Sequence, residues 1–573
     1  MPSSTMDTMY KDEQIVMTTK NKTEKSTTIA MERRRVDSVD ANKVHIAGGN
    51  HTGIIINKQI TNGADVDHSA PQLSLEFKVF LINATTQKHM LESRQLRFWF
   101  KDEFPISDRA KYAQEFFKEL VSPTEFPRDY VGFIMKIMKL MQVRYVYLRK
   151  VEIELRQLEE TDRPPERPMS ADDAAHAGRV EATEEKLLEM IESSYPNPLT
   201  LQDISRQTTS GEDEIRCHLS VLQSKGLIKA LDNNAFTRVV QNETTVKIVK
   251  QMPKMVKAKQ PTIAIITAQY CEKLAVDAMI ENQETFVRYT TVGESNVYTL
   301  GNMGAHRVVS TKLPSVGHTR EAIIAAGNTT TRLLGTFQKV DYVFLIGVGG
   351  GVPHFTDYNK HVRLGDVVVS TQTENQQFVY LHCDKATEKS SGGLEFETRG
   401  WIPSSLILQE IASQIQAEGE EEWAQYAEMG LDILNEQEAD FARPPPMSDK
   451  LYMAIGEKDV IEVAHPTPSY NEPRRIMESR VHLGPVASGR QVARDDHLRQ
   501  ELAARLGILA FDSEFDSVLE SVIGNRRDAF VVIRGIADYK DGTRRRDWQP
   551  HSALLAAAFA KAIISRMDPP TDD

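Results

Sequence analysis

Acidic residues in the C-terminal half of the chain follow short apolar segments, at positions where strands would end. Asp538 comes after the runs VVI and GIA that flank Arg534, and Glu272 comes shortly after the run TIAIITA. A carboxyl group in such a poorly solvated setting tends to have a raised pKa, which a general acid requires. A carboxylate in a first helical turn is also a common cap. Each residue taken singly therefore leaves a catalytic and a structural interpretation open.

A glycine-rich segment, GVGGGV at residues 347–352, follows the apolar run YVFLI. Consecutive glycines let the backbone approach a ligand closely and direct amide groups at anionic or hydroxyl oxygens. Val348, Gly349 and Gly350 are therefore candidate ligand contacts. The spacing is not GxGxxG, and no Lys-Ser or Lys-Thr follows as in a Walker loop. A tight turn that packing requires is the alternative.

Short β-branched runs separated by helical segments carry these residues. From Pro261 onward the chain contains TIAIITA, YVFLIGVGGG, VRLGDVVVS and AFVVIRGIADY. This alternation predicts a three-layer α/β fold, in which a largely parallel or mixed sheet is flanked by helices on both faces. Ligands of such sheets collect at the carboxyl ends of the strands, which is where the acidic and glycine residues fall.

Residues 261–568 resemble the nucleoside phosphorylase and nucleosidase superfamily. The resemblance runs through IAIITAQYCEKLAV, VYTLGNMGAHRVV, VFLIGVGGGVP, VRLGDVVVST, LGPVASGRQV, LAFDSEFDS, VVIRGIADYKDG and ALLAAAFAKAII. The segment is similar in particular to 5'-methylthioadenosine/S-adenosylhomocysteine nucleosidases and to the phosphorylase domains of NTPase-type immune receptors. The ordered series of motifs is specific, although no single one is. Residues at about 384–480 are expected to form an insertion in this domain.

The resemblance implies a role for several residues. Asp538 matches the general acid that protonates the purine at N7, and Glu272 looks like the carboxylate that activates the attacking water. Glu514 matches the acidic residue that binds the ribose hydroxyls, and Arg534 resembles the basic residue before the acid. The implied ligand is a purine nucleoside or nucleotide, the implied reaction is cleavage of the N-glycosidic bond, and neither a cofactor nor a metal is expected.

Departures from the family pattern concern the nucleophile and the pocket. Val348 stands where many members have Ser or Thr, and ITAQYCEK lacks the Arg expected in the phosphorylases, so hydrolysis is favoured over phosphorolysis. Ser513 replaces a Met that forms a wall against the ribose, and Phe515 replaces a small residue. Val492 takes the place of an aromatic residue that stacks on the base. The alternatives are a catalytically inactive nucleoside sensor or scaffold and a phosphate-dependent phosphorylase.

Residues 183–242, after a polar linker at 163–182, resemble a winged helix. The pattern predicts two strands preceded by three helices, at Glu184–Ser194, Leu201–Gln207 and Glu212–Lys225. Gly226 is expected to end the third helix in a left-handed conformation. The first turn of that helix, Gly211–Glu214, carries three carboxylates that would repel DNA phosphates. A protein or intramolecular partner is therefore favoured over DNA, although the basic linker at 243–260 keeps DNA binding and a role in transcription as alternatives.

The N-terminal part of the chain gives weaker signals. Residues 1–70 are polar with scattered aliphatic residues, and we expect a disordered tail there. Residues 71–162 are expected to form an α+β region of unknown role, with a strand from Gln72 and a helix from Asp108. The stripe of Met, Ile and Leu over 130–160 predicts one long helix.

The composition limits partners and compartment. The 573 residues include 69 Lys and Arg against 81 Asp and Glu, a formal net charge of -12, which argues against a general affinity for nucleic acid or anionic membranes. The three cysteines form no CxxC pair, so neither a disulfide framework nor a zinc site is predicted. Without an apolar stretch of membrane-spanning length, a cytoplasmic protein is expected, with the nucleus as an alternative. The family resemblance implies a homo-oligomer.

Overall fold

The computed structural model places most of the chain in two compact units. It describes residues 13–23, 25–35, 44–46, 55–57, 69–82, 89–122, 126–127, 130–161, 181–231, 234–239, 246–249, 252–253, 255, 259–288, 295–314, 320–389, 393–418, 421–435, 440–455, 460–468, 479–512, 515–527, 529–540 and 546–570. Each unit combines separate stretches of the chain.

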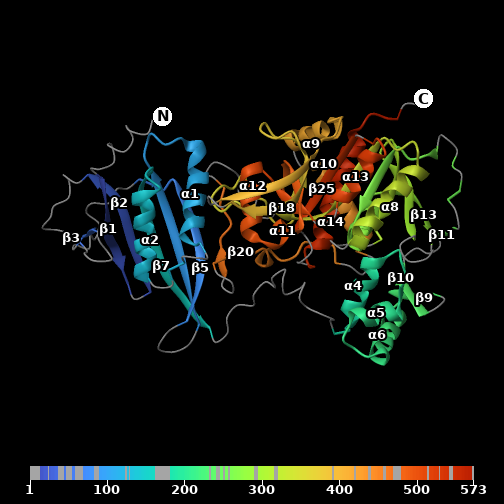
Figure 1. The fold of residues 1–573 in the computed structure, drawn as a ribbon, viewed down its shortest axis with the longest axis horizontal. Coiled ribbons are helices and arrows are strands. Elements are labelled where there is room, and N and C mark those ends of the chain that lie inside the picture. Colours follow the sequence, from blue (N-terminus) through green and yellow to red (C-terminus); the bar gives the residue numbers. More distant parts are fainter. Residues whose placement is uncertain are drawn as a thin grey trace. The chain divides into compact units, whose positions relative to one another are not determined.

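Unit 1 contains residues 1–168, 353–361 and 449–475 and is built on a mainly antiparallel sheet. The strand order is β20-β21-β5-β6-β7-β2-β1-β4-β3. The strands are β1 (Glu13–Lys22), β2 (Ser26–Arg35), β3 (Val44–Ile46), β4 (Ile55–Asn57), β5 (Leu73–Ile82), β6 (His89–Phe100), β7 (Leu148–Thr161), β20 (Leu451–Ala454) and β21 (Val460–Val463). Two helices, α1 (Ile106–Leu120) and α2 (Tyr130–Val143), accompany the sheet (Figure 1).

Aromatic side chains join these two helices to the sheet. The ring of Phe77 on β5 lies 5.3 Å from that of Phe117 on α1 and 6.3 Å from that of Phe133 on α2. Phe98 on β6 meets Phe116 edge to face at 5.7 Å. All five side chains are fully buried, so α1 and α2 cover one core together. The strand from Gln72 and the helix from Asp108 predicted for this region are confirmed.

The expectation of a disordered tail over residues 1–70 is wrong for β1 and β2, which form an antiparallel hairpin. β2 also pairs with β7, in a register that includes Met31 opposite Val151. Val16, Ile29 and Met31 are buried because β7, far along the chain, supplies the partner strand. β3 and β4 are ordered as well. The remaining residues of the expected tail up to 68 lie outside the described residues, apart from 23 and 25.

The prediction of a single helix over 130–160 is also wrong. The helix α2 ends at Val143, and the strand β7 follows. Val151 and Ile153 are buried, while Glu152 between them forms an ion pair of 2.9 Å with Arg97 on β6. Leu, Glu and Arg favour helices. Here the alternation of buried and charged residues and the cross-strand pairs outweigh that preference.

The stretch expected as an insertion in the α/β domain, residues 384–480, divides between the two units. Residues 449–475 belong to unit 1, where β21 pairs with β5 through Glu462 opposite Lys78. The Lys78 ammonium donates a hydrogen bond of 2.8 Å to Glu462. The first part of the stretch stays in unit 2, which contains residues 169–352, 362–448 and 476–573.

The winged helix at the start of unit 2 has the three helices and two strands that its sequence predicts, together with the short strand β8. These are α4 (Glu184–Ser194), β8 (Leu199–Thr200), α5 (Leu201–Gln207), α6 (Glu212–Ser224), β9 (Ile228–Leu231) and β10 (Ala235–Arg238). Thr200 and Asp203 cap α5 reciprocally. Gly226 follows α6 with a φ of 74°, the left-handed conformation expected for it.

A mixed sheet forms the centre of the rest of unit 2, with thirteen strands among the described residues. The parallel pairs β15–β12, β12–β16 and β16–β25 lie in its middle. The strands are β11 (Val246–Ile248), β12 (Ile263–Thr267), β13 (Glu281–Arg288), β14 (Asn296–Met303), β15 (His306–Lys312), β16 (Tyr342–Gly351), β17 (Val367–Val369), β18 (Tyr380–Glu388), β19 (Leu394–Trp401), β22 (Val481–Leu483), β23 (Val486–Ser488), β24 (Ala510–Asp512) and β25 (Ala529–Asp538).

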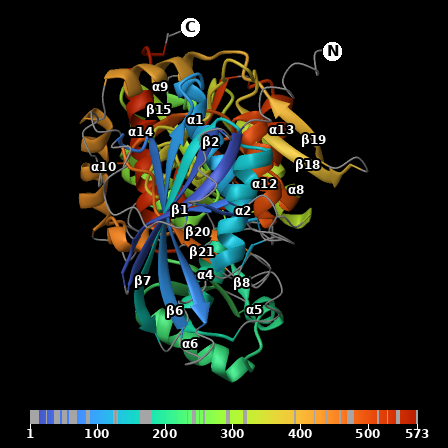
Figure 2. The same ribbon diagram turned by 90° about the vertical axis from the view of Figure 1, so that its left-hand side faces the viewer.

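Helices cover both faces of this sheet. They are α7 (Tyr270–Ala278), α8 (Arg320–Thr336), α9 (Ile407–Glu418), α10 (Glu421–Leu434), α11 (Arg490–Arg494), α12 (Asp496–Leu506), α13 (Asp516–Gly524) and α14 (Gln549–Arg566). The buried helix α14 packs against β16, β25, α7, α9 and α10, whereas α8 packs with α13. In Figure 2, α9, α10 and α14 lie together at the left, and α8 and α13 lie at the right. The predicted three-layer α/β fold is confirmed.

Candidate functional site

The Glu272 side chain, in the first turn of α7, accepts hydrogen bonds from three backbone N–H groups. Its Oε2 accepts from Ala268 and Gln269, and its Oε1 accepts from Val348 on β16, all at 2.8 Å. Burial raises the pKa of Glu272, while these N–H donors and the charge of Arg534 oppose the rise. The carboxyl group therefore caps α7 and also joins it to the glycine-rich strand.

Glycine is required in β16 where charged side chains cross it. A Cβ at Gly347 would lie 2.7 Å from Glu272 Oε1 and 3.0 Å from Arg534 Nη1, and a Cβ at Gly349 would lie 3.0 Å from the carbonyl oxygen of Phe511. Real Cβ atoms do not make such contacts without a shift of the neighbouring atoms. The glycine-rich run thus makes room for the buried charges of the protein itself.

Arg534, in the middle of β25, is fully buried and binds Asp512 on β24. Its Nε and Nη2 donate to Asp512 Oδ2 at 3.1 and 2.7 Å, and the Tyr380 hydroxyl donates to Asp512 Oδ1 at 2.6 Å. The Phe515 ring lies 4.0 Å from the guanidinium carbon, a cation–π distance. Burial and the charge of Asp512 raise the pKa of Tyr380, so its hydroxyl remains a donor.

Asp538, the last residue of β25, is 3% exposed. Its Oδ1 accepts a hydrogen bond of 2.8 Å from the backbone N–H of Lys540. In the parallel pair it lies opposite Gly350, two residues beyond the Val348 N–H that binds Glu272. Two residues of a strand span about 7 Å. The Val348 N–H that binds Glu272 and the backbone partner of Asp538 therefore lie on one short stretch of β16.

Three predicted site residues remain, Val492, Ser513 and Glu514. Val492 on α11 is fully buried in an apolar cluster with Leu381, Cys383 and Leu502. Its side chain thus serves core packing, and its contact with a base stays a prediction. Ser513 and Glu514 lie outside the described residues.

A polar cluster that the sequence did not indicate lies next to Asp512. Ser488 on β23 is opposite Asp512 in the sheet, and its Oγ lies 2.8 Å from the Nδ1 of His382 on β18. The same nitrogen is 3.6 Å from Asp516 Oδ2. Burial raises the pKa of Asp516, and the charge of Asp512 adds to this rise while His382 opposes it. His382 and Ser488 come from strands that are far apart in sequence and meet only in the sheet, which explains why no local motif signals the cluster.

The part of the chain that the structure describes contains no group of three or more His, Cys, Asp or Glu side chains arranged to hold a metal ion. The Cys271 thiol, beside Glu272, has its pKa raised by burial and by the charge of Glu272. Across the described helices, none is long and apolar enough to span a membrane.

The winged helix packs against the sheet beside α7. Lys312, at the end of β15, is 1% exposed, and its Nζ donates to the carbonyl oxygens of Ser193, Tyr195 and Leu313, each at 2.9 Å. The ring of Tyr195 meets that of Tyr270 edge to face at 5.5 Å. Tyr270 is in the same helical turn as Glu272, so the winged helix lies next to the candidate site.

A second contact supports this docking of the winged helix. The Arg238 guanidinium on β10 lies 5.3 Å from the Tyr270 ring and donates a hydrogen bond of 3.0 Å to Glu192 on α4.

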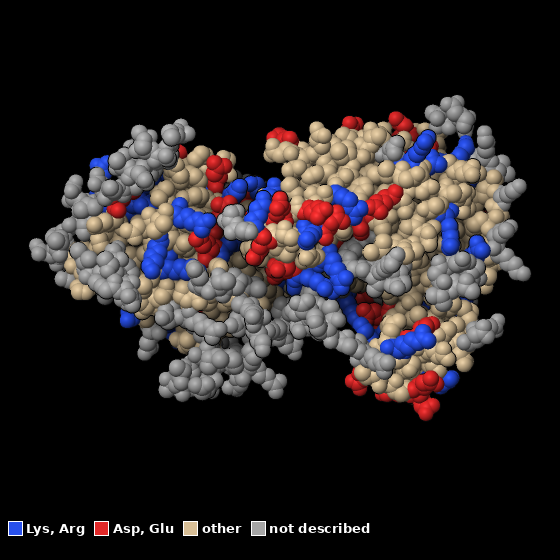
Figure 3. All heavy atoms as spheres, viewed as in Figure 1, with Lys and Arg blue, Asp and Glu red and all other residues tan. Residues whose placement is uncertain are grey.

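The helix α6, at the position that contacts DNA in other winged helices, begins with negative charge, which would repel DNA phosphates. Its first turn contains Glu212, Asp213 and Glu214. Figure 3 shows acidic side chains gathered around the end of the winged helix that carries α6.

Comparison with known proteins identifies the family. A model of the phosphorylase superfamily matches residues 262–565, more than half of the chain, and a model of a winged helix-turn-helix domain matches residues 173–240. The chain therefore belongs to the phosphorylase superfamily and carries a winged helix upstream of the phosphorylase domain.

Individual relatives are more distant. The chain is 28% identical over 315 residues to a nucleotide-binding leucine-rich repeat (NLR)-like protein of Hyaloscypha variabilis. The match covers 54% of this chain and 29% of that protein, so the chain spans less than a third of that relative's length.

Solved structures with similar parts include a nucleosidase and a hydrolase. One is the 5'-methylthioadenosine/S-adenosylhomocysteine nucleosidase of Neisseria meningitidis in complex with methylthio-immucillin-A, which is 16% identical with a TM-score of 0.32 and covers 54% of this chain and 100% of its own. The other is the futalosine hydrolase of Helicobacter pylori, 16% identical with a TM-score of 0.31, covering 53% and 97%.

Proposed function

We propose that the α/β domain binds a purine nucleoside or nucleotide and cleaves its N-glycosidic bond with water. The observation that carries this proposal is the pair of buried carboxyl groups next to the glycine-rich strand β16: Glu272 accepts a hydrogen bond from Val348 of this strand, and Asp538 is paired with Gly350, two residues further along it. Membership of the phosphorylase superfamily gives both groups a reaction to perform.

In the proposed reaction, Asp538 donates its proton to N7 of the purine, and the base leaves with the electron pair of the glycosidic bond. Glu272 takes a proton from a water molecule as the water oxygen bonds to the sugar carbon. The ionised carboxylate also stabilises the positive charge that develops on the sugar ring. The two groups need opposite protonation states, which different surroundings can impose. Glu514, outside the described residues, is proposed to bind the ribose hydroxyls.

The hydrogen bond from Val348 to Glu272 favours water over phosphate as the nucleophile. This backbone N–H, on the glycine-rich strand β16, already donates to a carboxylate. A phosphate ion placed there would meet the negative charge of Glu272 in a poorly solvated site, where repulsion between like charges is strong. A water molecule is uncharged and meets no such repulsion.

The proposal is tested by following the release of free base from adenosine, 5'-methylthioadenosine and AMP by chromatography, with and without phosphate. We expect release without phosphate and a loss of about 10²- to 10⁴-fold in Asp538→Asn, the range for removal of a general acid. Asp341→Asn is the matched control because the Asp341 side chain is 67% exposed. Full activity in Asp538→Asn, or release only in the presence of phosphate, would contradict the proposal.

A nucleoside sensor without catalysis is the second candidate, and the environment of Glu272 favours it. The carboxylate is held by three N–H donors that join α7 to β16, and Tyr195 of the winged helix packs on the same helix. Such a sensor would release no base. It would still be stabilised by the nucleoside, by about 2.7 kcal/mol at a hundredfold excess over Kd, which a rise in melting temperature would report.

We further propose that the winged helix serves intramolecular docking rather than DNA binding. The two carbonyl oxygens of the winged helix that Lys312 binds, those of Ser193 and Tyr195, and the acidic first turn of α6 support this assignment. A gel-shift assay at low ionic strength, where phosphate contacts are strongest, is expected to show no DNA complex. A complex with low-micromolar affinity would contradict it.

A further inference from the structure

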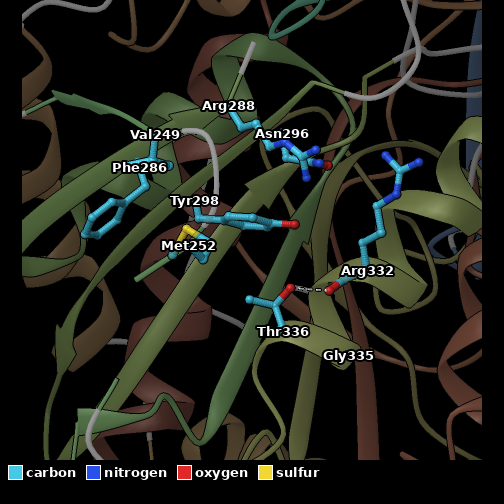
Figure 4. Close-up of a pocket in the computed structure, with 9 residues that line it drawn as sticks. All are labelled: Val249, Met252, Phe286, Arg288, Asn296, Tyr298, Arg332, Gly335 and Thr336. Carbon is cyan, nitrogen blue, oxygen red and sulfur yellow. Dashed lines mark hydrogen bonds between the residues drawn. The ribbon is translucent and has the colours of Figure 1, made fainter. Parts of the chain in front are cut away.

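Unit 2 contains a pocket that shares no residue with the site around Glu272 and Asp538. Its volume is about 330 Å³, and its wall combines β13, β14, α8 and the segment after β11. The lining residues are Val249, Met252, Phe286, Arg288, Asn296, Tyr298, Arg332, Gly335 and Thr336 (Figure 4). The volume is at the lower end of the range for small-molecule sites.

Two arginines bring positive charge to one part of this wall. Figure 4 shows the side chains of Arg288 and Arg332 on either side of the Tyr298 hydroxyl. Burial raises the pKa of Tyr298 to about 12, and the positive charges of Arg332 and Arg288 act against the rise. Both guanidinium groups are therefore within electrostatic reach of that hydroxyl, and none of the residues described as lining the pocket is acidic.

The remaining wall offers hydrogen bonds at one side and apolar surface at the other. Asn296 lies beside the guanidinium of Arg288 in Figure 4, and the Thr336 hydroxyl donates to the carbonyl oxygen of Arg332 at 2.7 Å, which leaves its oxygen lone pairs available. Phe286, Met252 and Val249 supply the apolar part. Guanidinium groups suit phosphate because their planar donors match its oxygens, and an apolar wall suits a ring.

We infer that this pocket binds the phosphate group of a phosphorylated aromatic compound such as a nucleotide, with the phosphate between Arg288 and Arg332 and the ring against the apolar wall. Val249 and Met252 belong to the segment that connects β11 to β12, and β11 is held to the sheet by its pairing with β13. A bound nucleotide would therefore hold that connecting segment to the α/β domain.

Isothermal titration of the full chain with ADP, inorganic pyrophosphate and adenosine tests the inference. We expect ADP to bind more tightly than pyrophosphate, and the affinity for ADP to fall by about 10- to 100-fold in Arg288→Met and in Arg332→Met, as for lost hydrogen bonds to a charged group. Gly335→Phe is an independent variant. A Cβ at Gly335 meets no atom within 4 Å, so the new ring can fill the pocket without strain in α8, and ADP binding should be lost.

Two further variants distinguish this site from the proposed catalytic site. Arg206→Met is the matched control, since the Arg206 side chain is 74% exposed on α5, and it should leave ADP binding unchanged. Asp538→Asn should also leave the ADP affinity of this pocket unchanged, whatever becomes of nucleoside cleavage. No binding of ADP to the wild type at millimolar concentration, unchanged ADP binding in Gly335→Phe and both arginine variants, or equal affinity for ADP and pyrophosphate would overturn the inference.

Discussion

At the scale of single residues, Glu272 is placed under two opposing influences. Burial favours its neutral form, whereas three N–H donors and Arg534 favour the ionised form, and the balance raises its pKa. A general base must be ionised. The proposed reaction therefore depends on a group whose ionisation is displaced to higher pH than that of an ordinary Glu.

The first prediction concerns this pH dependence. The rate of base release at low substrate concentration should rise with pH as Glu272 ionises, with a midpoint above the usual Glu value of about 4.3. Glu272→Gln should lower the rate by about 10²- to 10⁴-fold and remove that rise, while Glu501→Gln, on the exposed part of α12, should leave both unchanged. A rise that persists in Glu272→Gln would assign it to another group.

The raised pKa also fixes the sign of a stability effect. Since the folded state holds the Glu272 proton more tightly than the unfolded state, its contribution to stability is present at low pH and is lost as pH rises from the unfolded to the folded pKa. Glu272→Gln should remove this part of the pH dependence of unfolding.

The second prediction concerns the buried pair of Arg534 and Asp512. Arg534→Met removes both hydrogen bonds that Arg534 donates to the buried Asp512 carboxylate, and it removes the contact with Phe515. Loss of one member of a buried ion pair costs about 3–5 kcal/mol. Amide hydrogen exchange should therefore accelerate in β16 and β25, which are paired along their length.

A surface ion pair gives the comparison for that experiment. Arg399 on β19 binds Asp384 on β18, and their side chains are 47% and 34% exposed. Arg399→Met should cost less than about 1 kcal/mol. Equal effects of the two variants would mean that Arg534 does not hold β24 and β25 together as the hydrogen bonds indicate.

At the scale of helices and strands, local patterns predicted those elements whose partners are close in sequence or whose faces are both buried. The winged helix and the apolar strands β12, β16 and β25 follow from periodicity, turn residues and β-branched runs. The strand-end positions of Glu272 and Asp538 follow from the same patterns. The strand β7 was not predicted, because its Glu, Leu and Arg residues favour helices and its strand pairing depends on β6 and β2.

The polar surroundings of the candidate site depend on sheet order, which local sequence does not contain. Tyr380 reaches Asp512 because β18, β23 and β24 are neighbours in the sheet. His382 and Ser488 meet for the same reason. Val492 packs in an apolar cluster, which its place in a motif did not indicate, and its contact with a base stays a prediction.

The third prediction concerns the contact between the winged helix and the sheet. Lys312→Met leaves three buried carbonyl oxygens without the ammonium donor, and an unsatisfied buried group costs about 1–3 kcal/mol. Amide hydrogen exchange in α4 and in the following turn to β8 should therefore accelerate, with little change in β25. Lys225→Met is the matched control, because Lys225 is 55% exposed and bound to Glu184 within the winged helix. Protection of α4 that is unchanged in Lys312→Met would show that the other contacts suffice for docking.

At the scale of the whole molecule, the chain passes more than once between its two compact units. Residues 353–361 and 449–475 belong to unit 1, although the stretches around them belong to unit 2. β21 completes the sheet of unit 1 beside β5, and β20 pairs with β21. The backbone therefore crosses between the two units several times, whereas two domains joined by a single linker would be crossed once.

The last prediction follows from this connectivity. A fragment of residues 169–573 retains β20 and β21 but lacks β5, so the edge of β21 that pairs with β5 loses its partner. Unpaired strand edges promote association between chains, and we expect this fragment to elute from size-exclusion chromatography as aggregates. The same fragment with residues 449–475 replaced by a Gly-Ser linker of equal length should elute as a smaller, uniform species, since flexible linkers of that length cost little. If the unmodified fragment is as uniform as the replaced one, β20 and β21 do not need the sheet of unit 1 to remain soluble. Light scattering on both samples, and on the full chain, also measures the homo-oligomer that the family resemblance implies.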